Sequence, residues 1–316
     1  MRRPQRLRLY WSLAHLAVAF FVLFRAEGSL ALTALSHLVF FDAGGAAVCV
    51  AVDVLGNFDA WRRSSVRHPF GLERAEVLAG FALSVFLLFG GFDLVSHGAR
   101  HFLADAGDHE HPHPHTGRVV APGSVEWAAG LAILGTAISA YGLRNQARIA
   151  KVMRVSYLAS MPRALSNPFH VLTLSFSALL LSLPLLSVPL SAWIDHLICA
   201  AIAVSMFAFG LRLAVAQGLM LLMSYGGSKD VGSVVREIEA DPAVARVEEA
   251  QFWQVHYGLG MANLTVRVPS GSDEGTLSKL RSRIASLVQN SLGEGYGQGA
   301  SVRWDVTVQM GTDVTS

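Results

Sequence analysis

The stretch SLALTALSHLVFFDAGGAAVCVAVDVL, residues 29–55, decides the fold class of this chain. It is apolar over more than the roughly 20 residues that an α-helix needs to cross a bilayer. Asp42 stands near its middle, and an ionisable side chain at the centre of a membrane helix costs about 2.5–3.5 kcal/mol on insertion scales. The stretch therefore predicts a membrane-spanning helix that carries one candidate functional carboxylate.

Five further apolar segments have similar lengths, near residues 9–24, 75–97, 121–143, 165–188 and 190–211. Hydrophobic residues make up 52% of the 316-residue chain and charged residues only 15%, whereas soluble domains carry about 25% charged residues. The net charge of +2 disfavours nucleic acid as a partner. We predict an α-helical membrane protein with six transmembrane helices, residues 1–218. The first segment could instead be a signal peptide, although Arg25 and Glu27 stand where a cleavage site belongs.

Basic residues gather in alternate connections between these segments. They lie in the N-terminal stretch (Arg2, Arg3, Arg6, Arg8), between the second and third segments (Arg62, Arg63, Arg67, Arg74), and between the fourth and fifth (Arg144, Arg148, Lys151, Arg154, Arg163). The other connections hold Arg25, Arg100 and Arg118. Because loops rich in Lys and Arg stay on the cytosolic side, we expect both termini in the cytosol.

Residues 228–310 follow a different pattern. Helical periodicity alternates with extended runs in the order α-β-β-α-β, over residues 231–238, 246–257, 261–268, 276–292 and 301–308. The turn Gly258-Leu259-Gly260 between the two central runs is typical of a hairpin. We expect a small cytosolic α+β domain of the ferredoxin-like type.

Other polar residues inside the apolar segments have simpler interpretations. Asp53, Asp93 and Asp195 lie near segment ends, where water can reach a carboxylate. Cys49 and Cys199 fall inside apolar runs and are expected to be buried, free thiols. His170, in the fifth segment, is the second ionisable residue placed well inside a predicted helix.

Helical geometry limits which residues can act together with these two. Residues four apart differ by about 40° around a helix, whereas residues five apart differ by about 140°. Leu38 therefore shares a face with Asp42, and Leu174 shares one with His170. His37 does not share the face of Asp42 on a regular helix.

The stretch FGLERAEVLAGF, residues 70–81, carries the most specific resemblance. Phe70, Gly71, Arg74 and Glu76 fit the pattern F-G-x-x-R-x-E, which is similar to the entry of the third helix in the cation diffusion facilitator family of zinc transporters. The six-helix layout with an α-β-β-α-β tail also resembles that family. So do SLALTALSHLVFFD (29–42) and NPFHVLTL (167–174), at the places where the family has H-x-x-x-D.

The resemblance implies a zinc site made by two facing H-x-x-x-D pairs. Carried over to this chain, the four positions are Leu38, Asp42, His170 and Leu174, so two of the four ligands are missing. Leucine cannot bind zinc, and tetrahedral zinc sites use four N, O or S ligands. Asp42 and His170 are thus the remnants of an incomplete site, and we hypothesise that they pair with each other across the second and fifth helices.

Two further regions depart from the family pattern or add to it. Gln251 stands where the family's H-x-W histidine is expected before Trp253, and His256 is read as an ordinary hydrogen-bonding residue. The histidine-rich stretch HEHPHPH lies between the third and fourth helices, on the predicted lumenal side. It could bind metal weakly through His109, His111, His113 and His115.

Functionally, the paired loss resembles the non-transporting, zinc-regulated partner subunits of this family. The resemblance implies an auxiliary subunit of a heterodimeric zinc/proton antiporter in the endoplasmic reticulum or early secretory membrane. The same resemblance implies that the chain is not an enzyme, that it binds no cofactor tightly, and that zinc is the cargo of the complex. One alternative is a homodimeric transporter with a site rebuilt from His37, Asp42 and His170 plus Asp93 or His196. Another is a membrane zinc sensor or scaffold that uses the histidine-rich stretch.

Overall fold

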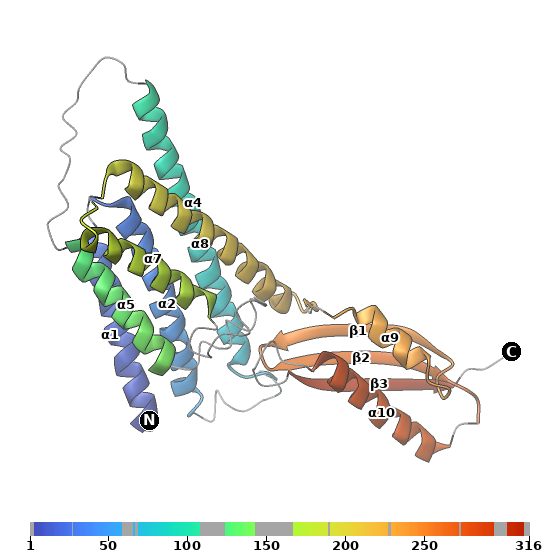
Figure 1. The fold of residues 1–316 in the computed structure, drawn as a ribbon. Coiled ribbons are helices and arrows are strands. Elements are labelled where there is room, and N and C mark those ends of the chain that lie inside the picture. Colours follow the sequence, from blue (N-terminus) through green and yellow to red (C-terminus); the bar gives the residue numbers. More distant parts are fainter. Residues whose placement is uncertain are drawn as a thin grey trace. The chain divides into compact units, whose positions relative to one another are not determined.

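The computed structural model describes residues 3–26, 28–58, 66, 69–107, 124–142, 167–188, 190–226, 229–271, 273–293 and 302–312. Contacts divide the chain into two compact units, residues 1–215 and 216–316. The first unit and the start of the second are built from six apolar helices, in the order α1 (Arg3–Arg25), α2 (Leu30–Leu55), α4 (Glu73–Gly107), α5 (Ser124–Gly142), α7 (Pro168–Leu185) and α8 (Ala192–Leu221) (Figure 1).

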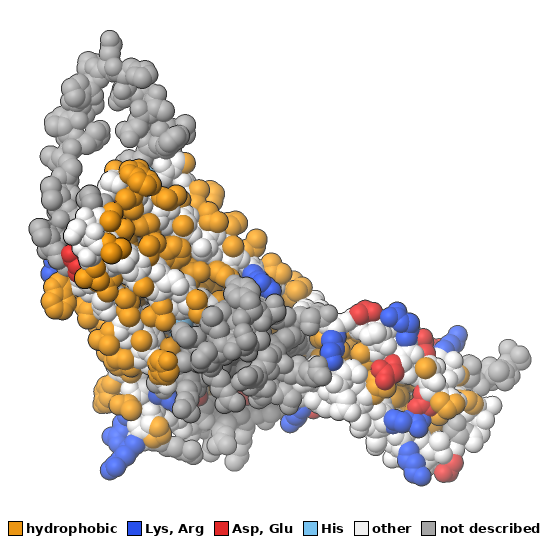
Figure 2. All heavy atoms as spheres, viewed as in Figure 1, with side chains coloured by type: hydrophobic (Ala, Val, Ile, Leu, Met, Phe, Trp, Pro, Cys, Tyr) orange, Lys and Arg blue, Asp and Glu red, His pale blue; other side chains and the backbone are white. Residues whose placement is uncertain are grey.

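Five of these six described helices, all but α5, are long and apolar enough to cross a membrane. The sixth contributes the shorter apolar stretch Val125–Tyr141. Figure 2 shows hydrophobic side chains spread over the outside of the helices, as a surface in contact with lipid requires. The predicted six-helix membrane protein is confirmed.

Four of the helices form the packed centre of the membrane unit. Helix α1 packs along both α2 and α5, α5 packs along α7, and α2 also touches α7. Both cysteines, Cys49 of α2 and Cys199 of α8, are free and buried as expected.

The first turn of α8 is joined to the beginning of α2 by a buried carboxylate. Asp195 accepts hydrogen bonds from Ser29 Oγ at 2.6 Å, Leu30 N at 2.8 Å and Ala31 N at 3.1 Å. A carboxylate at a helix N-terminus satisfies backbone N–H groups that lack partners in the helix and interacts favourably with its dipole. The expectation that Asp195 is a water-exposed carboxylate at a helix end is therefore wrong, because it caps a neighbouring helix.

The carboxylate at the other end of α2 behaves as expected. Asp53 is part-exposed and forms an ion pair with Arg8 of α1, with 3.0 Å between Arg8 Nη1 and Asp53 Oδ2. Asp93 of α4 is exposed.

The second unit has the predicted element order α-β-β-α-β. Its elements are α9 (Val231–Glu239), β1 (Arg246–His256), β2 (Leu259–Val268), α10 (Glu274–Leu292) and β3 (Arg303–Thr312). The sheet order is β1-β2-β3, with β1 antiparallel and β3 parallel to β2. The α+β class of this domain is confirmed.

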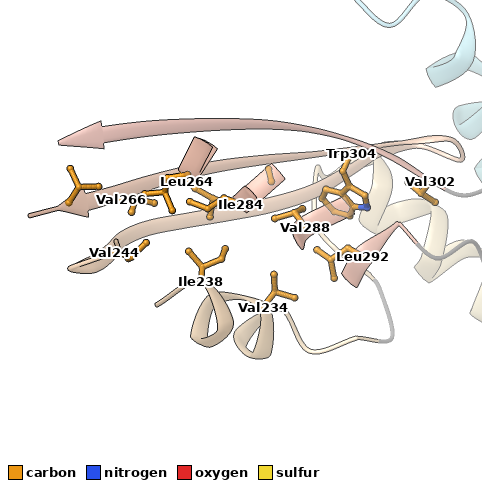
Figure 3. Close-up of a cluster of buried hydrophobic side chains, with 13 residues drawn as sticks. Val234, Ile238, Val244, Leu264, Val266, Ile284, Val288, Leu292, Val302 and Trp304 are labelled. Carbon is orange, nitrogen blue, oxygen red and sulfur yellow. The ribbon is translucent and has the colours of Figure 1, made fainter. Parts of the chain in front are cut away.

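One hydrophobic core lies between this sheet and its two helices (Figure 3). Helix α9 contributes Val234 and Ile238, and β2 contributes alternate residues such as Leu264 and Val266. Trp304 of β3 closes the core over Gly260, where a Cβ atom would lie 2.6 Å from the Trp304 ring. Alternation along β2 and β3 thus directs one face of the sheet inward, as the sequence pattern predicts.

A charged cluster lies on the exposed part of this sheet. The Glu248 carboxylate is 3.0 Å from Arg267 Nε and 3.0 Å from Arg246 Nη2. The hydrogen bond with Arg267, with both nearby guanidinium charges, lowers the pKa of Glu248 below its usual value. Hydrogen bonds and opposite charges favour the ionised form of a carboxyl group.

Candidate functional site

Asp42 and His170 meet inside the membrane unit. Asp42 lies in the middle of α2 and His170 in the first turn of α7, and each has 2% of its surface exposed. Their nearest atoms, Asp42 Oδ1 and His170 Nε2, are 2.8 Å apart. At this distance each side chain partly offsets the free-energy cost of burying the other.

The local sequence explains why α7 begins just before His170. Helix α7 begins at Pro168 after the N-cap Asn167, whose side chain accepts a hydrogen bond from Phe169 N at 3.1 Å. Proline suits the first helical position because its missing N–H would lack a partner there in any case. The cap and the proline therefore set the start of α7, and His170 falls within its first turn.

A third ionisable side chain, which the sequence reasoning missed, belongs to the same site. His15 of α1 is completely buried, and its Nε2 lies 3.7 Å from Asp42 Oδ2. Gly135 of α5 allows this approach, since a Cβ atom there would lie 3.2 Å from His15 Cδ2. The signal was available: His15 stands within an apolar segment, where the insertion cost that singled out Asp42 applies as well.

The two leucines at the remaining family positions differ in exposure. Leu38 is buried and Leu174 is half-buried. Next to the polar pair, the rings of Phe41 and Phe169 pack with their centroids 4.3 Å apart. Among the described residues, no group of three or more His, Cys, Asp or Glu side chains is arranged to hold a metal ion.

The additional residues considered for a rebuilt site, His37, His196 and Asp93, lie elsewhere. His37 points toward α4, where its ring stacks on Phe86 with centroids 6.2 Å apart and its Nδ1 lies 2.9 Å from Thr33 O. His196 is exposed, and its Nδ1 contacts the carbonyl of Ala192. The structure does not bring these residues, or the exposed Asp93, to Asp42.

The signature residues lie at the entry to α4. Gly71 has φ +54°, a left-handed conformation that favours glycine. Arg74 is half-buried, and Glu76 is buried in the first turn of the helix, five residues after Gly71. Phe70 lies in the turn before the helix. The glycine thus has a backbone reason for its place in the motif.

The remaining candidates lie in the second unit or outside the described residues. Gln251 is exposed on β1 and donates to Glu249 Oε1 at 2.7 Å. His256 Nδ1 accepts from Gly258 N at 3.2 Å, so this histidine stabilises the hairpin turn. The histidine-rich stretch with His109, His111, His113 and His115 lies outside the described residues.

The chain is similar to one family model and to several known proteins. The model of the cation efflux transmembrane domain matches residues 9–222. The chain is 28% identical over 313 residues to "Probable zinc transporter zrg17" of Schizosaccharomyces pombe, covering 97% of this chain and 75% of that protein. It is 25% identical over 254 residues to "Zinc transporter 6" of Mus musculus and of Homo sapiens. That match covers 72% of this chain, which spans about half (52%) of the Zinc transporter 6 length.

Proposed function

The chain belongs to the cation efflux family of membrane transporters, and from that premise we propose that it is the non-transporting subunit of a heterodimeric zinc/proton antiporter. Its partner is a second, transport-competent family member that carries a complete zinc site. The complex supplies zinc to the endoplasmic reticulum or early secretory lumen, with both termini of this chain in the cytosol. Zinc is the cargo of the complex and not a resident cofactor of this chain.

One observation carries the proposal. Leucines occupy two of the four ligand positions, and the remaining two residues, Asp42 and His170, contact each other at 2.8 Å. A site with one carboxylate offers a single negative charge against the +2 of the ion. Zinc would also have to separate a pair whose members already offset each other's burial.

The surroundings of the pair support the same function. Leu38, at one of the family's ligand positions, is buried, and the Phe41–Phe169 contact sets two apolar rings one residue before Asp42 and His170 in the sequence. A subunit that only pairs with a transporter keeps its helix packing and its cytosolic domain, whereas its ligand positions are free to become apolar. Apolar side chains suit these positions because no water inside the bilayer solvates an unused ligand.

The relatives support zinc as the cargo. Both proteins named above are described as zinc transporters. We place this chain in a secretory-pathway membrane by its resemblance to the partner-subunit class, and we assign residues 228–310 to pairing in the cytosol.

The test is zinc uptake into proteoliposomes under an imposed proton gradient. We expect no uptake with this chain alone, and uptake when a transport-competent family member is reconstituted with it. The Asp42→Ala variant serves as the matched control, and monodisperse elution verifies folding. Uptake by the chain alone that is lost in Asp42→Ala would contradict the proposal and would establish a homodimeric transporter.

A further inference from the structure

Hydroxyl groups in the described membrane helices commonly bond to their own helix. Seven of them donate to a carbonyl three or four residues earlier, at 2.6–2.9 Å: Ser12, Thr33, Ser36, Ser84, Ser96, Ser182 and Ser205. This local bond is the usual way for a serine or threonine to satisfy its hydroxyl inside a helix.

Four buried hydroxyls in the same unit do not follow this behaviour. Thr136 and Ser139 of α5 and Thr173 and Ser177 of α7 are at most 1% exposed. Their oxygen atoms find no hydrogen-bond partner among the described residues. Since helical geometry offers each of them a backbone carbonyl, the lack of that bond leaves each hydroxyl able to bind another partner.

All four belong to two helices that pack along each other. Thr136 and Ser139 are three residues apart and Thr173 and Ser177 four apart, so each pair occupies one helical face. His170 lies three residues before Thr173, on the same face of α7. At 1.5 Å per residue, this line of polar groups extends about 10 Å along α7 from the Asp42–His170 pair.

A fifth polar side chain reaches the same interior from α1. Both ring nitrogens of the buried His15 lack a hydrogen bond to any described residue, and the ring rests against α5 at Gly135. The buried face of α5 is otherwise made of small residues, among them Ala129 and Ala132.

Buried polar groups without a protein partner are normally satisfied by internal water, and one water can serve two to four of them. We propose that α1, α5 and α7 enclose a hydrated compartment whose ligand is water, held by His15, Thr136, Ser139, Thr173 and Ser177. This compartment adjoins the Asp42–His170 pair. It goes beyond the proposed function and does not depend on it.

The chemistry of the groups favours water over a metal ion. Hydroxyls and the imidazole of His15 carry no negative charge, and the one carboxylate nearby, Asp42, is already in contact with His170. Hydroxyls both donate and accept hydrogen bonds, which matches the two donors and two acceptors of water.

Cysteine accessibility tests the compartment directly. The chain has two cysteines, so single cysteines are introduced in a Cys49→Ala, Cys199→Ala background. Ser139→Cys and Ser177→Cys report on the compartment. The matched controls Ile138→Cys and Leu179→Cys lie on the same helices, at side chains 36% and 42% exposed on the outside of the unit.

The reagent is a small, water-soluble methanethiosulfonate added to proteoliposomes. Because the reactive thiolate forms only where water reaches it, we expect at least tenfold faster labelling at the two compartment positions than at the two controls. Equal rates at compartment and control positions would overturn the proposal.

A second pair of measurements does not depend on access for a reagent. Thr136→Val and Thr173→Val keep the side-chain shape but remove the hydroxyl that holds water, so we expect a lower Tm for each. An unchanged or raised Tm would show that the hydroxyls were unsatisfied and would overturn the proposal. Zinc binding by the unmodified chain that disappears in His15→Ala would overturn water as the occupant.

Discussion

Replacing Asp195 by alanine removes the link between the start of α8 and the start of α2. Three donors lose their acceptor: the hydroxyl of Ser29 and the backbone N–H groups of Leu30 and Ala31, now 2.6, 2.8 and 3.1 Å from the carboxylate. The two N–H groups belong to the first turn of α2, where the helix itself offers no partner.

The magnitude follows from these contacts. Hydrogen bonds to a charged group contribute about 1.5–3 kcal/mol each, and a carboxylate at a helix N-terminus adds about 0.3–1 kcal/mol. The terms do not add fully, because Ser29 Oγ still accepts from Leu32 N at 3.1 Å and keeps α2 capped. We therefore expect Asp195→Ala to lower the free energy of unfolding by about 3 kcal/mol.

Unfolding of the full chain in mixed micelles, with SDS as denaturant and tryptophan fluorescence as readout, measures this loss. Asp195→Asn keeps one oxygen, which can accept from Ser29 Oγ and Ala31 N, but its NH2 group cannot accept from Leu30 N. It should therefore lose about 2 kcal/mol. Asp93→Ala removes an exposed carboxylate of a neighbouring helix and should stay within about 0.5 kcal/mol of the parent.

The reasoning fails if Asp195→Ala is no less stable than Asp93→Ala. In that case water would already satisfy the start of α2, and the carboxylate would be the interfacial group that its position in the sequence suggests. Equal losses in the alanine and asparagine variants would indicate that the charge contributes most of the stabilisation.

Three more outcomes are expected. The double substitution Leu38→His with Leu174→Asp should create zinc binding detectable by calorimetry, because it completes a set of four ligands with Asp42 and His170. A double variant that binds no zinc would contradict the alignment of these positions. Val266→Asp buries an unpaired carboxylate in the core of the second unit and should lower its free energy of unfolding by more than about 4 kcal/mol. This variant should no longer co-purify with a partner subunit, whereas Val266→Ala should. Unchanged co-purification of Val266→Asp would place pairing in the membrane. Since the pKa of Glu248 is lowered in the folded chain, its contribution to stability is present above the ordinary glutamate pKa and is lost as the pH falls through the lowered value. Glu248→Gln should flatten that part of a pH–stability curve, and an unchanged curve would refute the link.

Much of the fold is predictable because the bilayer imposes simple rules. A spanning helix needs a long apolar run, so all six helices stood out as such runs, and α2 was identified within one residue of its observed start. The second unit was predictable for a similar reason, because the alternation around Val302 and Trp304 and the helical spacing of Ile284 and Val288 each allow one buried face.

The candidate site was only half predictable, and the missing half has a physical reason. Asp42 and His170 stood out as ionisable residues inside apolar segments, and the family-like motifs then paired them. His15 also stands within an apolar segment but belongs to no motif, and its distance of 3.7 Å from Asp42 shows which residue it accompanies. The cap made by Asp195 depends on a partner more than 160 residues earlier in the chain, which no local pattern records.

The particular combination of residues that remains at the incomplete site has a physical logic. Two retained carboxylates would repel each other in a low-dielectric interior. Two retained histidines would leave a protonated imidazole without a counter-charge in the membrane. This chain instead keeps one acid, Asp42, and one base, His170, and it keeps them on different helices. Two survivors four residues apart on one helix would each need another partner, whereas these two satisfy each other and connect α2 to α7. Under the function proposed above, loss of one histidine position and one aspartate position from opposite helices would disable a four-ligand zinc site and still leave one acid and one base in contact between α2 and α7.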